Sequence, residues 1–321
     1  MTFTVVVTDY DYPDVELERE LVEERGGRLV TAQAETPAEV VDAAAGADAL
    51  LVQYAPVGAD VFDALDDLAV VGRYGIGVDS VDLDAASANG VRVLNVPDYC
   101  LDEVSTHAFA LLLACVRRTS AYDSAIADGT WDWTAERPIH RLAGATLGLV
   151  GFGRIPQRLV EKAAAFDLDV VAYDPYVSAD VLAEHGVEKV EFDELLGRAD
   201  AVSVHTPLTD ETRGLFDRDA FGSMKETAVL VNTARGGVVD EDALADALDA
   251  GELAGAGLDV LPSEPPEGSP LVGRDDVVLT PHVAWYSEES FEELRRTVTE
   301  DVLRTLDGDA PRNLVNGDVR E

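Results

Sequence analysis

The chain has 321 residues, which is more than one hydrophobic core usually serves, so we expect two domains. Hydrophobic residues make up 47% and charged residues 27% of the sequence, a composition that excludes a disordered acidic protein. With 24 basic and 63 acidic residues, the chain has a net charge of −39. This charge and the lack of a stripe of basic residues exclude a nucleic-acid-binding surface.

Short β-branched runs alternate with amphipathic stretches along the whole chain, a pattern that predicts an α/β fold of parallel strands joined by crossover helices. In the first hundred residues we expect helices between strands at 3–7, 28–31, 49–52, 69–72 and 92–94. A long apolar helix is predicted over 104–118, or as far as 127, and separates this block from a second series.

The second series is predicted to form a doubly wound sheet of six strands with interposed helices. The strands are expected at 145–150, 169–173, 201–205, 228–232, 256–259 and 277–280, and the helices at 154–166, 178–185, 218–224 and 241–250. A last helix is predicted over 287–306, because a serine and an acidic first turn mark its beginning. We expect this helix to return to the first block, so that the first domain is discontinuous.

A glycine-rich turn lies directly after the predicted strand 145–150 and at the start of a helix, which is the context that a dinucleotide-binding motif requires. Gly151 permits the tight turn, Gly153 lets the backbone approach a pyrophosphate, and the helix N-terminus offers amide donors. Pro156 departs from the motif at its third position, although a proline in the first helical turn breaks no internal hydrogen bond.

An acidic residue ends the next predicted strand. Asp174 follows Gly151 by 23 residues, where a carboxylate accepts hydrogen bonds from the adenosine ribose of a bound dinucleotide. The same carboxylate opposes a 2′-phosphate, so NAD is favoured over NADP. A solvated surface aspartate in an acid-rich chain is the alternative.

Three ionisable residues follow predicted strands of the second series, at the sheet edge where open α/β sheets bind ligands. Arg235 offers a planar fork that matches a carboxylate, and His282 can exchange a proton near neutral pH. Glu264 beside the histidine favours the imidazolium form. Each residue alone is explained by a structural or solvated role, but beside a nicotinamide the three together predict hydride transfer to a 2-oxo acid.

Several longer motifs surround these residues, namely Gly151-Phe-Gly-Arg-Ile, Tyr173-Asp-Pro-Tyr, His205-Thr-Pro-Leu-Thr, Asn232-Thr-Ala-Arg-Gly-Gly, Leu258-Asp-Val, Glu264-Pro-Pro and Thr280-Pro-His-Val-Ala-Trp. With them the sequence resembles the D-isomer-specific 2-hydroxyacid dehydrogenases over nearly its whole length. Within that family it most resembles the branch containing the C-terminal binding proteins, through Asn95-Val-Pro-Asp-Tyr-Cys, Trp131-Asp-Trp and Ala284-Trp-Tyr-Ser-Glu-Glu.

The resemblance implies two Rossmann-like doubly wound parallel-sheet domains with an interdomain cleft, NAD as the cofactor, and a homodimer. It assigns residues 1–100 with 291–321 to a flavodoxin-like substrate-binding domain and residues 101–290 to the NAD-binding Rossmann domain. The substrate is a small 2-oxo or 2-hydroxy acid whose side chain the sequence does not resolve.

The resemblance also implies roles by position: Arg235 orients the substrate, Glu264 keeps the histidine charged, and His282 is the general acid in reduction. The implied substrate-binding residues are Arg73, Tyr74, Gly75, Ile76, Gly77, Arg235 and Trp285. The implied cofactor-binding residues are Val104, Gly151, Gly153, Arg154, Ile155, Asp174, Pro175, His205, Thr206, Pro207, Thr212, Thr233, Ala234, Arg235, Asp259, His282 and Ala284.

The remaining aromatic and histidine residues have less specific readings. We expect Trp131 and Trp133 to be core or dimer-contact residues, and Trp285 to be either a pocket residue or a buried anchor. His107 is expected to be structural, and His205 is expected to act through its backbone without ionising.

Other functions stay open beside a dehydrogenase. Formate or phosphite oxidation on the same fold is disfavoured, because formate enzymes of the family have an amide in place of Glu264. An NAD-sensing protein related to corepressors is an alternative from another class. A phosphoglycerate dehydrogenase is a third, although a regulatory domain does not fit into 321 residues and no basic cluster near Arg73 marks a phosphate pocket.

Residue usage also predicts the compartment and the salt concentration in which the protein works. Cys100 and Cys115 give neither a disulfide framework nor a metal-ligand spacing, and the N-terminus is typical of a strand, so we expect a cytoplasmic protein without a membrane span. Only three of the basic residues are lysines, and carboxylates occur throughout, which is typical of proteins from salt-loving organisms. We therefore expect a protein that requires salt.

Overall fold

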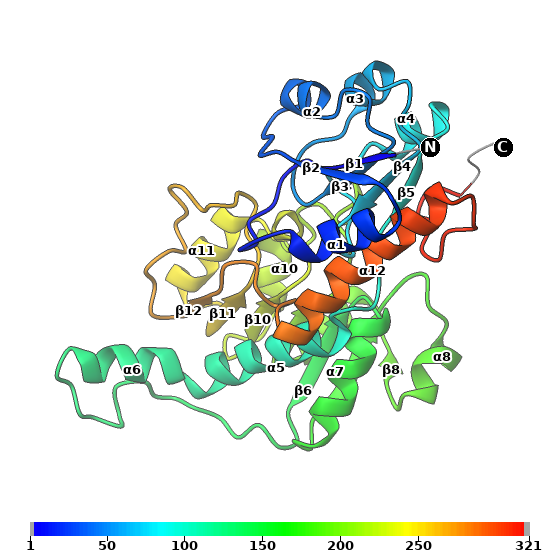
Figure 1. Cartoon of the computed structure of the whole chain (residues 1–321). Helices are drawn as coiled ribbons and strands as arrows, with labels where there is room; N and C mark the ends of the chain where they lie inside the picture. The colour runs from blue at the N-terminus through cyan, green and yellow to red at the C-terminus, as the bar shows by residue number, and fades with distance from the viewer. Residues whose placement is uncertain (1–2, 318–321) are drawn as a thin grey trace. The chain divides into compact units, whose positions relative to one another are not determined.

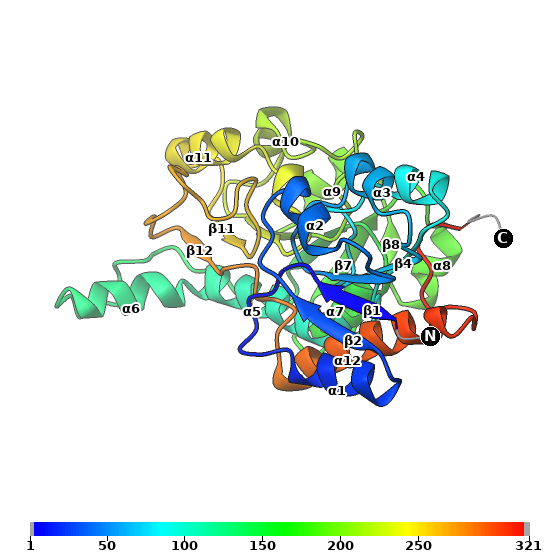
Figure 2. The ribbon, with the colours of Figure 1, turned by 45° about the horizontal axis from the view of Figure 1, so that its top comes forward.

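The computed structural model describes residues 3–317, and the chain divides into two compact units. Unit 1 combines the chain up to Tyr99 with the chain from Ser287 onward, and unit 2 is Cys100–Tyr286. Each unit is built on one parallel β-sheet with helices packed against it (Figures 1 and 2). The predicted α/β class is therefore confirmed.

The sheet of unit 1 has five parallel strands in the order β2-β1-β3-β4-β5, which is the flavodoxin-like order. Its strands are β1 (Thr4–Val7), β2 (Arg28–Thr31), β3 (Ala49–Val52), β4 (Val70–Arg73) and β5 (Arg92–Leu94). Its helices are α1 (Glu16–Glu24), α2 (Pro37–Ala43), α3 (Ala59–Ala64), α4 (Leu83–Ala88) and α12 (Glu288–Leu306). The central strand β3 is buried at every residue, as expected when helices cover both faces of a parallel sheet.

Helix α12 brings the C-terminal part of the chain onto the first sheet. Ser287 caps the helix as predicted, because its hydroxyl accepts a hydrogen bond from the Ser290 amide. The helix packs against β4 and against α1. Helix α1 lies beside α12 in both views (Figures 1 and 2). Arg295 of α12 forms a buried ion pair with Glu18 of α1, with Nε 2.8 Å from Oε1.

The sheet of unit 2 has seven parallel strands in the order β12-β11-β10-β9-β6-β7-β8. The strand order reverses between β6 and β9, which is the position where doubly wound sheets bind nucleotides. The strands are β6 (Thr146–Val150), β7 (Asp169–Tyr173), β8 (Glu188–Lys189), β9 (Ala201–Val204), β10 (Val229–Asn232), β11 (Gly255–Leu258) and β12 (Val277–Leu279). The helices are α5 (Leu101–Arg117), α6 (Thr119–Ala127), α7 (Arg154–Ala164), α8 (Ala179–Glu184), α9 (Phe192–Arg198), α10 (Arg218–Ser223), the 3₁₀ turn η1 (Gly236–Val238) and α11 (Glu241–Ala250).

Strand β8 and the 3₁₀ turn η1 of unit 2 were not predicted. The expected six-stranded sheet has a seventh strand, β8, whose two polar residues pair only with β7 and give no hydrophobic pattern. Helix α9 is also absent from the prediction. The helix predicted over 104–118 is present as α5, whereas its extension as far as 127 is a separate helix, α6, because Arg118 adopts a left-handed conformation with φ of +51° between them.

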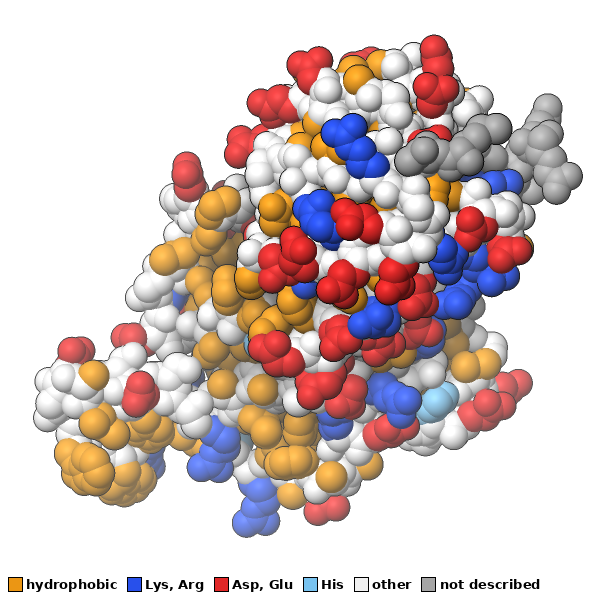
Figure 3. Space-filling view, viewed as in Figure 1, with side chains coloured by type: hydrophobic (Ala, Val, Ile, Leu, Met, Phe, Trp, Pro, Cys, Tyr) orange, Lys and Arg blue, Asp and Glu red, His pale blue; other side chains and the backbone are white. Residues whose placement is uncertain are grey.

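Helix α6 and the segment after it extend away from the sheet of unit 2 (Figure 1). Trp131 is 88% exposed and Trp133 is 73% exposed, so the core alternative for these residues is wrong, and the dimer-contact alternative stays a prediction. Hydrophobic side chains gather at the end of this extension, and acidic side chains are spread over the face shown (Figure 3). Among residues 3–317, no helix has both the length and the apolar composition needed to cross a bilayer.

Candidate active site

The glycine turn of unit 2 has the geometry of a phosphate-binding turn. Gly151 has a φ of +93°, and a Cβ there would lie 2.8 Å from the His205 carbonyl oxygen, so the position requires glycine. No atom lies within 4 Å of the Cβ position of Gly153, which leaves the backbone open to a ligand.

The start of α7 suits an anion. No side chain caps this eleven-residue helix, and its first turn contains no acidic residue in a chain of net charge −39. Amide donors and the positive end of the helix dipole at this point fit a pyrophosphate. Pro156 is the third residue of the helix and is buried there, so it fits the first turn despite its departure from the motif.

Asp174 is held beside the glycine turn. Its Oδ2 accepts a hydrogen bond from the Phe152 amide at 2.8 Å, and its Oδ1 accepts from the Tyr176 amide at 2.8 Å. Since each carboxylate oxygen can accept more than one hydrogen bond, ribose hydroxyls can still bind to it. The structure therefore brings Asp174 to the turn from the neighbouring strand β7.

The backbone of the loop after β9 lies against the glycine turn, since a Cβ on Gly151 would lie 2.8 Å from the His205 carbonyl oxygen. Burial lowers the pKa of His205 to about 3, and its Nε2 lies 2.8 Å from the Ser203 hydroxyl. The imidazole is therefore neutral at physiological pH, as predicted. Thr212 folds the loop back by donating a hydrogen bond to the carbonyl oxygen of Pro207 at 2.6 Å, and the partly buried Thr206 lies between these residues and β9.

The turn after β10 carries Arg235. The Asn232 side chain fixes this turn, because its oxygen accepts a hydrogen bond from the Ala234 amide and its nitrogen donates to the Arg235 carbonyl, both at 3.0 Å. A Cβ on Gly236 would lie 2.0 Å from the carbonyl carbon of Leu261. The absence of a side chain at Gly236 thus lets the Arg235 turn pack directly against the chain that leads to Glu264.

His282 and Glu264 form a close pair, with Nδ1 of the histidine 2.7 Å from Oε2 of the glutamate. The Leu261 amide donates to the other carboxylate oxygen at 3.0 Å. Partial burial would raise the pKa of Glu264, but the hydrogen bonds from His282 and Leu261 and the positive charge of Arg235 lower it below its ordinary value. The structure therefore brings the three predicted residues together.

The pair is also accessible. The side chains of His282 and Glu264 are 43% and 39% exposed, so a small ligand can reach the imidazole. With Nδ1 directed to the carboxylate, Nε2 is the ring nitrogen available for proton exchange. A cationic fork, an acid/base imidazole and its carboxylate partner can together bind an anionic substrate and move one proton.

Asp259 holds the loop that carries His282. Its buried carboxylate accepts hydrogen bonds from the Thr280 hydroxyl at 2.6 Å and from the amides of Val283 and Ala284 at 2.9 Å each. Its carbonyl oxygen accepts from the His282 amide at 2.8 Å. Its predicted contact with the nicotinamide stays a prediction.

The other predicted residues of unit 2 lie at or near the same edge of the sheet or on α5. Trp285 follows Ala284 and is neither fully buried nor fully exposed, with its ring 5.6 Å from that of Tyr286. Val104 is buried in α5, Thr233 lies in the turn before Arg235, and Pro175 follows Asp174 on the surface.

The predicted substrate loop lies in unit 1, at the end of β4. Gly75 has a φ of +147°, and a Cβ there would lie 1.4 Å from Nη1 of Arg73, so the guanidinium folds over this glycine. Tyr74 is buried and donates a hydrogen bond to Glu18 at 3.2 Å. The Ile76 carbonyl oxygen accepts a hydrogen bond from the Asn95 side chain at 2.6 Å, and Gly77 follows it. The segment is therefore anchored within unit 1.

Sequence patterns gave no role in the site to Asn232, Gly236, Leu261 and Thr280, and His107 was expected only to be structural, although all of these residues build the site. The first two lie inside the motif Asn232-Thr-Ala-Arg-Gly-Gly, so the motif itself was the available signal. Leu261 contacts Glu264 only three positions away, whereas Thr280 contacts Asp259 and His107 across 21 and 173 positions.

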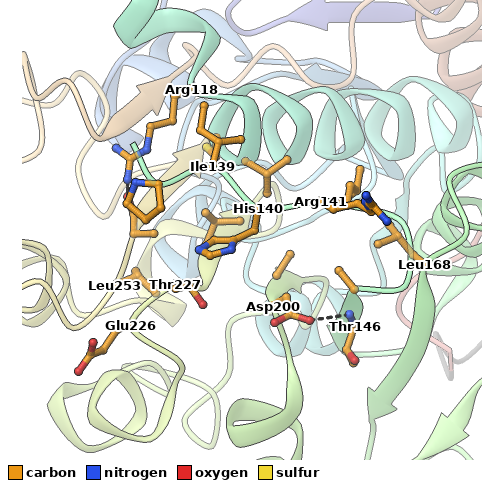
Figure 4. Close-up of a pocket in the computed structure, with 18 of the residues that line it drawn as sticks. Arg118, Ile139, His140, Arg141, Thr146, Leu168, Asp200, Glu226, Thr227 and Leu253 are labelled. Atoms are coloured by element: carbon orange, nitrogen blue, oxygen red, sulfur yellow. Dashed lines mark hydrogen bonds between the residues drawn. The ribbon is translucent and has the colours of Figure 1, made fainter. Parts of the chain in front are cut away.

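A cavity of about 570 Å³ lies elsewhere in unit 2, at the opposite edge of the sheet (Figure 4). Its lining includes Thr146 and Ala201, where strands β6 and β9 begin, and residues 138–145 that return from the α6 extension. The Arg235, Glu264 and His282 side chains follow the strand ends instead. This cavity is therefore separate from the candidate active site.

The doubly wound sheet and the open glycine turn define a Rossmann-fold nucleotide-binding protein. Residues 109–284 match the family model described as D-isomer specific 2-hydroxyacid dehydrogenase, NAD binding domain. The chain therefore belongs to the D-isomer specific 2-hydroxyacid dehydrogenase family, which confirms the resemblance, and unit 2 carries its NAD binding domain.

Individual relatives support the same family. The chain is 44% identical over 271 residues to D-3-phosphoglycerate dehydrogenase of Mycobacterium tuberculosis, a match that covers 84% of this chain and 51% of the relative. It is 40% identical over 269 residues to glyoxylate reductase of Korarchaeum cryptofilum, covering 82% of this chain and 81% of the relative. The chain thus spans about half the length of the phosphoglycerate dehydrogenase.

A solved structure matches the whole fold. The D-lactate dehydrogenase of Aquifex aeolicus in complex with NAD and lactic acid has a TM-score of 0.88 and 29% identity, and the match covers 98% of this chain and 99% of the other. The assignment to the branch of the C-terminal binding proteins stays a prediction.

Proposed function

We propose that this protein is an NAD-dependent D-2-hydroxyacid dehydrogenase that transfers a hydride between nicotinamide and C2 of a small 2-oxo or 2-hydroxy acid. The observation that carries the proposal is the pair of His282 and Glu264, 2.7 Å apart and within the electrostatic influence of Arg235. The glycine turn and Asp174 would hold the dinucleotide. When bound, the reduced cofactor supplies a hydride from its nicotinamide ring.

The protein side chains bind and orient the substrate and move the proton. Arg235 donates paired hydrogen bonds to the substrate and fixes its orientation, a factor that supplies much of the rate. As negative charge grows on the carbonyl oxygen, His282 donates the proton from Nε2 to it. Glu264 accepts a hydrogen bond from Nδ1 and stabilises the imidazolium, because its lowered pKa keeps it ionised. In the reverse direction the neutral imidazole accepts the hydroxyl proton.

The two units are proposed to divide the binding work. Unit 2 would bind NAD, and its Asp174 carboxylate would repel a 2′-phosphate and so select NAD over NADP. Unit 1 would bind substrate, with Arg73 and the amides of residues 75–77 on the substrate carboxylate. The other residues implied by the family resemblance would keep the roles stated for them.

The test is NADH oxidation against glyoxylate, hydroxypyruvate, pyruvate and 3-phosphohydroxypyruvate in molar KCl, repeated with NADPH. Turnover of at least one acid, with NADH preferred, is expected. Preference for 3-phosphohydroxypyruvate would select phosphoglycerate dehydrogenase activity, a second candidate that rests on the 44% identity to that enzyme. NADH-dependent capture of a peptide without turnover of any acid would instead indicate a corepressor-like sensor.

We also propose a cytoplasmic homodimer formed through the α6 extension. Ile126, Trp131 and Trp133 are each at least half exposed there, and exposed aromatic side chains on one segment are typical of an interface. Cys100 and Cys115 are both free thiols, which suits a reducing compartment. Light scattering should give twice the chain mass for the protein and the chain mass for a variant with Trp131→Ser and Trp133→Ser. A dimeric double variant would contradict this interface.

A further inference from the structure

His107 contacts the network that holds the His282 loop, although it lies far away in the sequence. It is on α5, which packs against β11 and β12, and its Nε2 lies 2.9 Å from the Thr280 hydroxyl oxygen. That oxygen lies 2.6 Å from Oδ1 of Asp259. The imidazole is 24% exposed and the Asp259 side chain is 1% exposed, so the network runs inward from the surface of the helix.

The chemistry of the three groups fixes the direction of the hydrogen bonds. A carboxylate only accepts, so the single hydroxyl hydrogen of Thr280 is donated to Asp259. The hydroxyl oxygen can then only accept from His107, whose Nε2 must carry a hydrogen. His107 therefore orients the Thr280 hydroxyl toward Asp259.

Asp259 passes this constraint to His282. It accepts hydrogen bonds from Thr280 before the histidine and from the Val283 and Ala284 amides after it, so it clamps the loop on both sides. Between these anchors His282 has a φ of +53°, a left-handed conformation that is unfavourable for a residue with a side chain. Such a conformation persists only where the surroundings enforce it.

We propose that His107 is a positioning residue for proton transfer. By donating to Thr280 it keeps the Thr280–Asp259 clamp closed, and the clamp holds His282 at the angle from which its imidazole meets both Glu264 and the substrate. This proposal rests on the proposed dehydrogenase function. His107 itself transfers no proton to the substrate.

The test compares variants that keep or remove the donor. His107→Leu removes it, whereas the side-chain amide of His107→Gln can still donate to Thr280. We expect kcat to fall at least about tenfold in His107→Leu, because small misplacements of a catalytic group are costly. The KM for NADH should change much less than kcat, since the glycine turn is untouched, and His107→Gln should recover most of kcat. His140→Leu, at the opposite edge of the sheet, is the matched control and should leave kcat unchanged.

Two further measurements separate positioning from a general loss of packing. The kinetic isotope effect with deuterated NADH should rise in His107→Leu, and its crystal structure should show His282 leaving its left-handed conformation or separating from Glu264. A His107→Leu enzyme with unchanged kcat and an intact pair would overturn the proposal. If that variant does not fold, Thr280→Val against Thr280→Ser makes the same comparison, and equal kcat values for the two would overturn it.

The outcomes also distinguish this proposal from the function on which it rests. A wild-type protein that oxidises no NADH with any 2-oxo acid would refute the function, and the variant crystal structures would still test the clamp. An active wild type with an equally active His107→Leu would refute the clamp alone.

Discussion

Replacing Gly236 with alanine should separate Arg235 from the His282–Glu264 pair. The new Cβ would lie 2.0 Å from the carbonyl carbon of Leu261, whereas carbon atoms pack at about 3.5 Å or more. The turn after β10 and the chain before Glu264 must therefore move apart by roughly 1.5 Å. Since a misplacement of about 1 Å costs on the order of 100-fold in rate, kcat/KM for the 2-oxo acid should fall by about 100-fold.

The assay is steady-state NADH oxidation in molar KCl, with circular dichroism to confirm that the variant is folded. Gly197→Ala is the matched control, because no atom lies within 4 Å of that Cβ position and Gly197 is in helix α9, where alanine is favoured. We expect the control to keep its full rate. A folded Gly236→Ala enzyme with kcat/KM within threefold of wild type would refute the reasoning that this close approach assembles the site.

Three predictions concern stability. The pKa of His205 is about 3 in the folded protein and 6.5 in the unfolded chain. As the pH falls below 6.5, the unfolded chain therefore takes up a proton that the folded protein does not, and about 2 kcal/mol of unfolding free energy is lost between pH 6.5 and pH 5. Urea unfolding at both values should show this loss in wild type and not in His205→Gln. Glu18→Ala leaves Arg295 without its buried partner and should lower the unfolding free energy by about 3 kcal/mol. Arg296→Ala removes an exposed ion pair and should lower the unfolding free energy by less than about 0.5 kcal/mol. With a net charge of −39, the thermal midpoint should rise from low salt to molar KCl; a flat midpoint would contradict screening of self-repulsion.

Buried strands could be predicted from the sequence because they form short hydrophobic runs. In β3 and β10 every residue is buried, and both strands were found within one residue of their bounds. Strand β8 was missed because Glu188 and Lys189 join the sheet only through backbone hydrogen bonds to β7. The position of Arg118 in the left-handed region could not be predicted either, because an arginine carries no signal for that conformation.

The part of the candidate site that could be predicted consists of residues that directly follow the ends of strands. Arg235, Glu264 and His282 were identified in this way, since parallel strands place such residues at one sheet edge. The contact between His107 and Thr280 spans 173 positions and follows from how α5 packs on the sheet, which no local pattern encodes. The core alternative for Trp131 was wrong. The sequence could not choose between a core and an interface position, because tryptophan is common in both.

The most direct test of the central claim is the rate of NADH oxidation by His282→Gln with the best 2-oxo acid of the panel. Glutamine keeps a polar side chain but cannot carry the transferable proton, so kcat should fall by about 100-fold or more while NADH still binds. Turnover equal to that of the wild type would show that the imidazole beside Glu264 is not the proton donor.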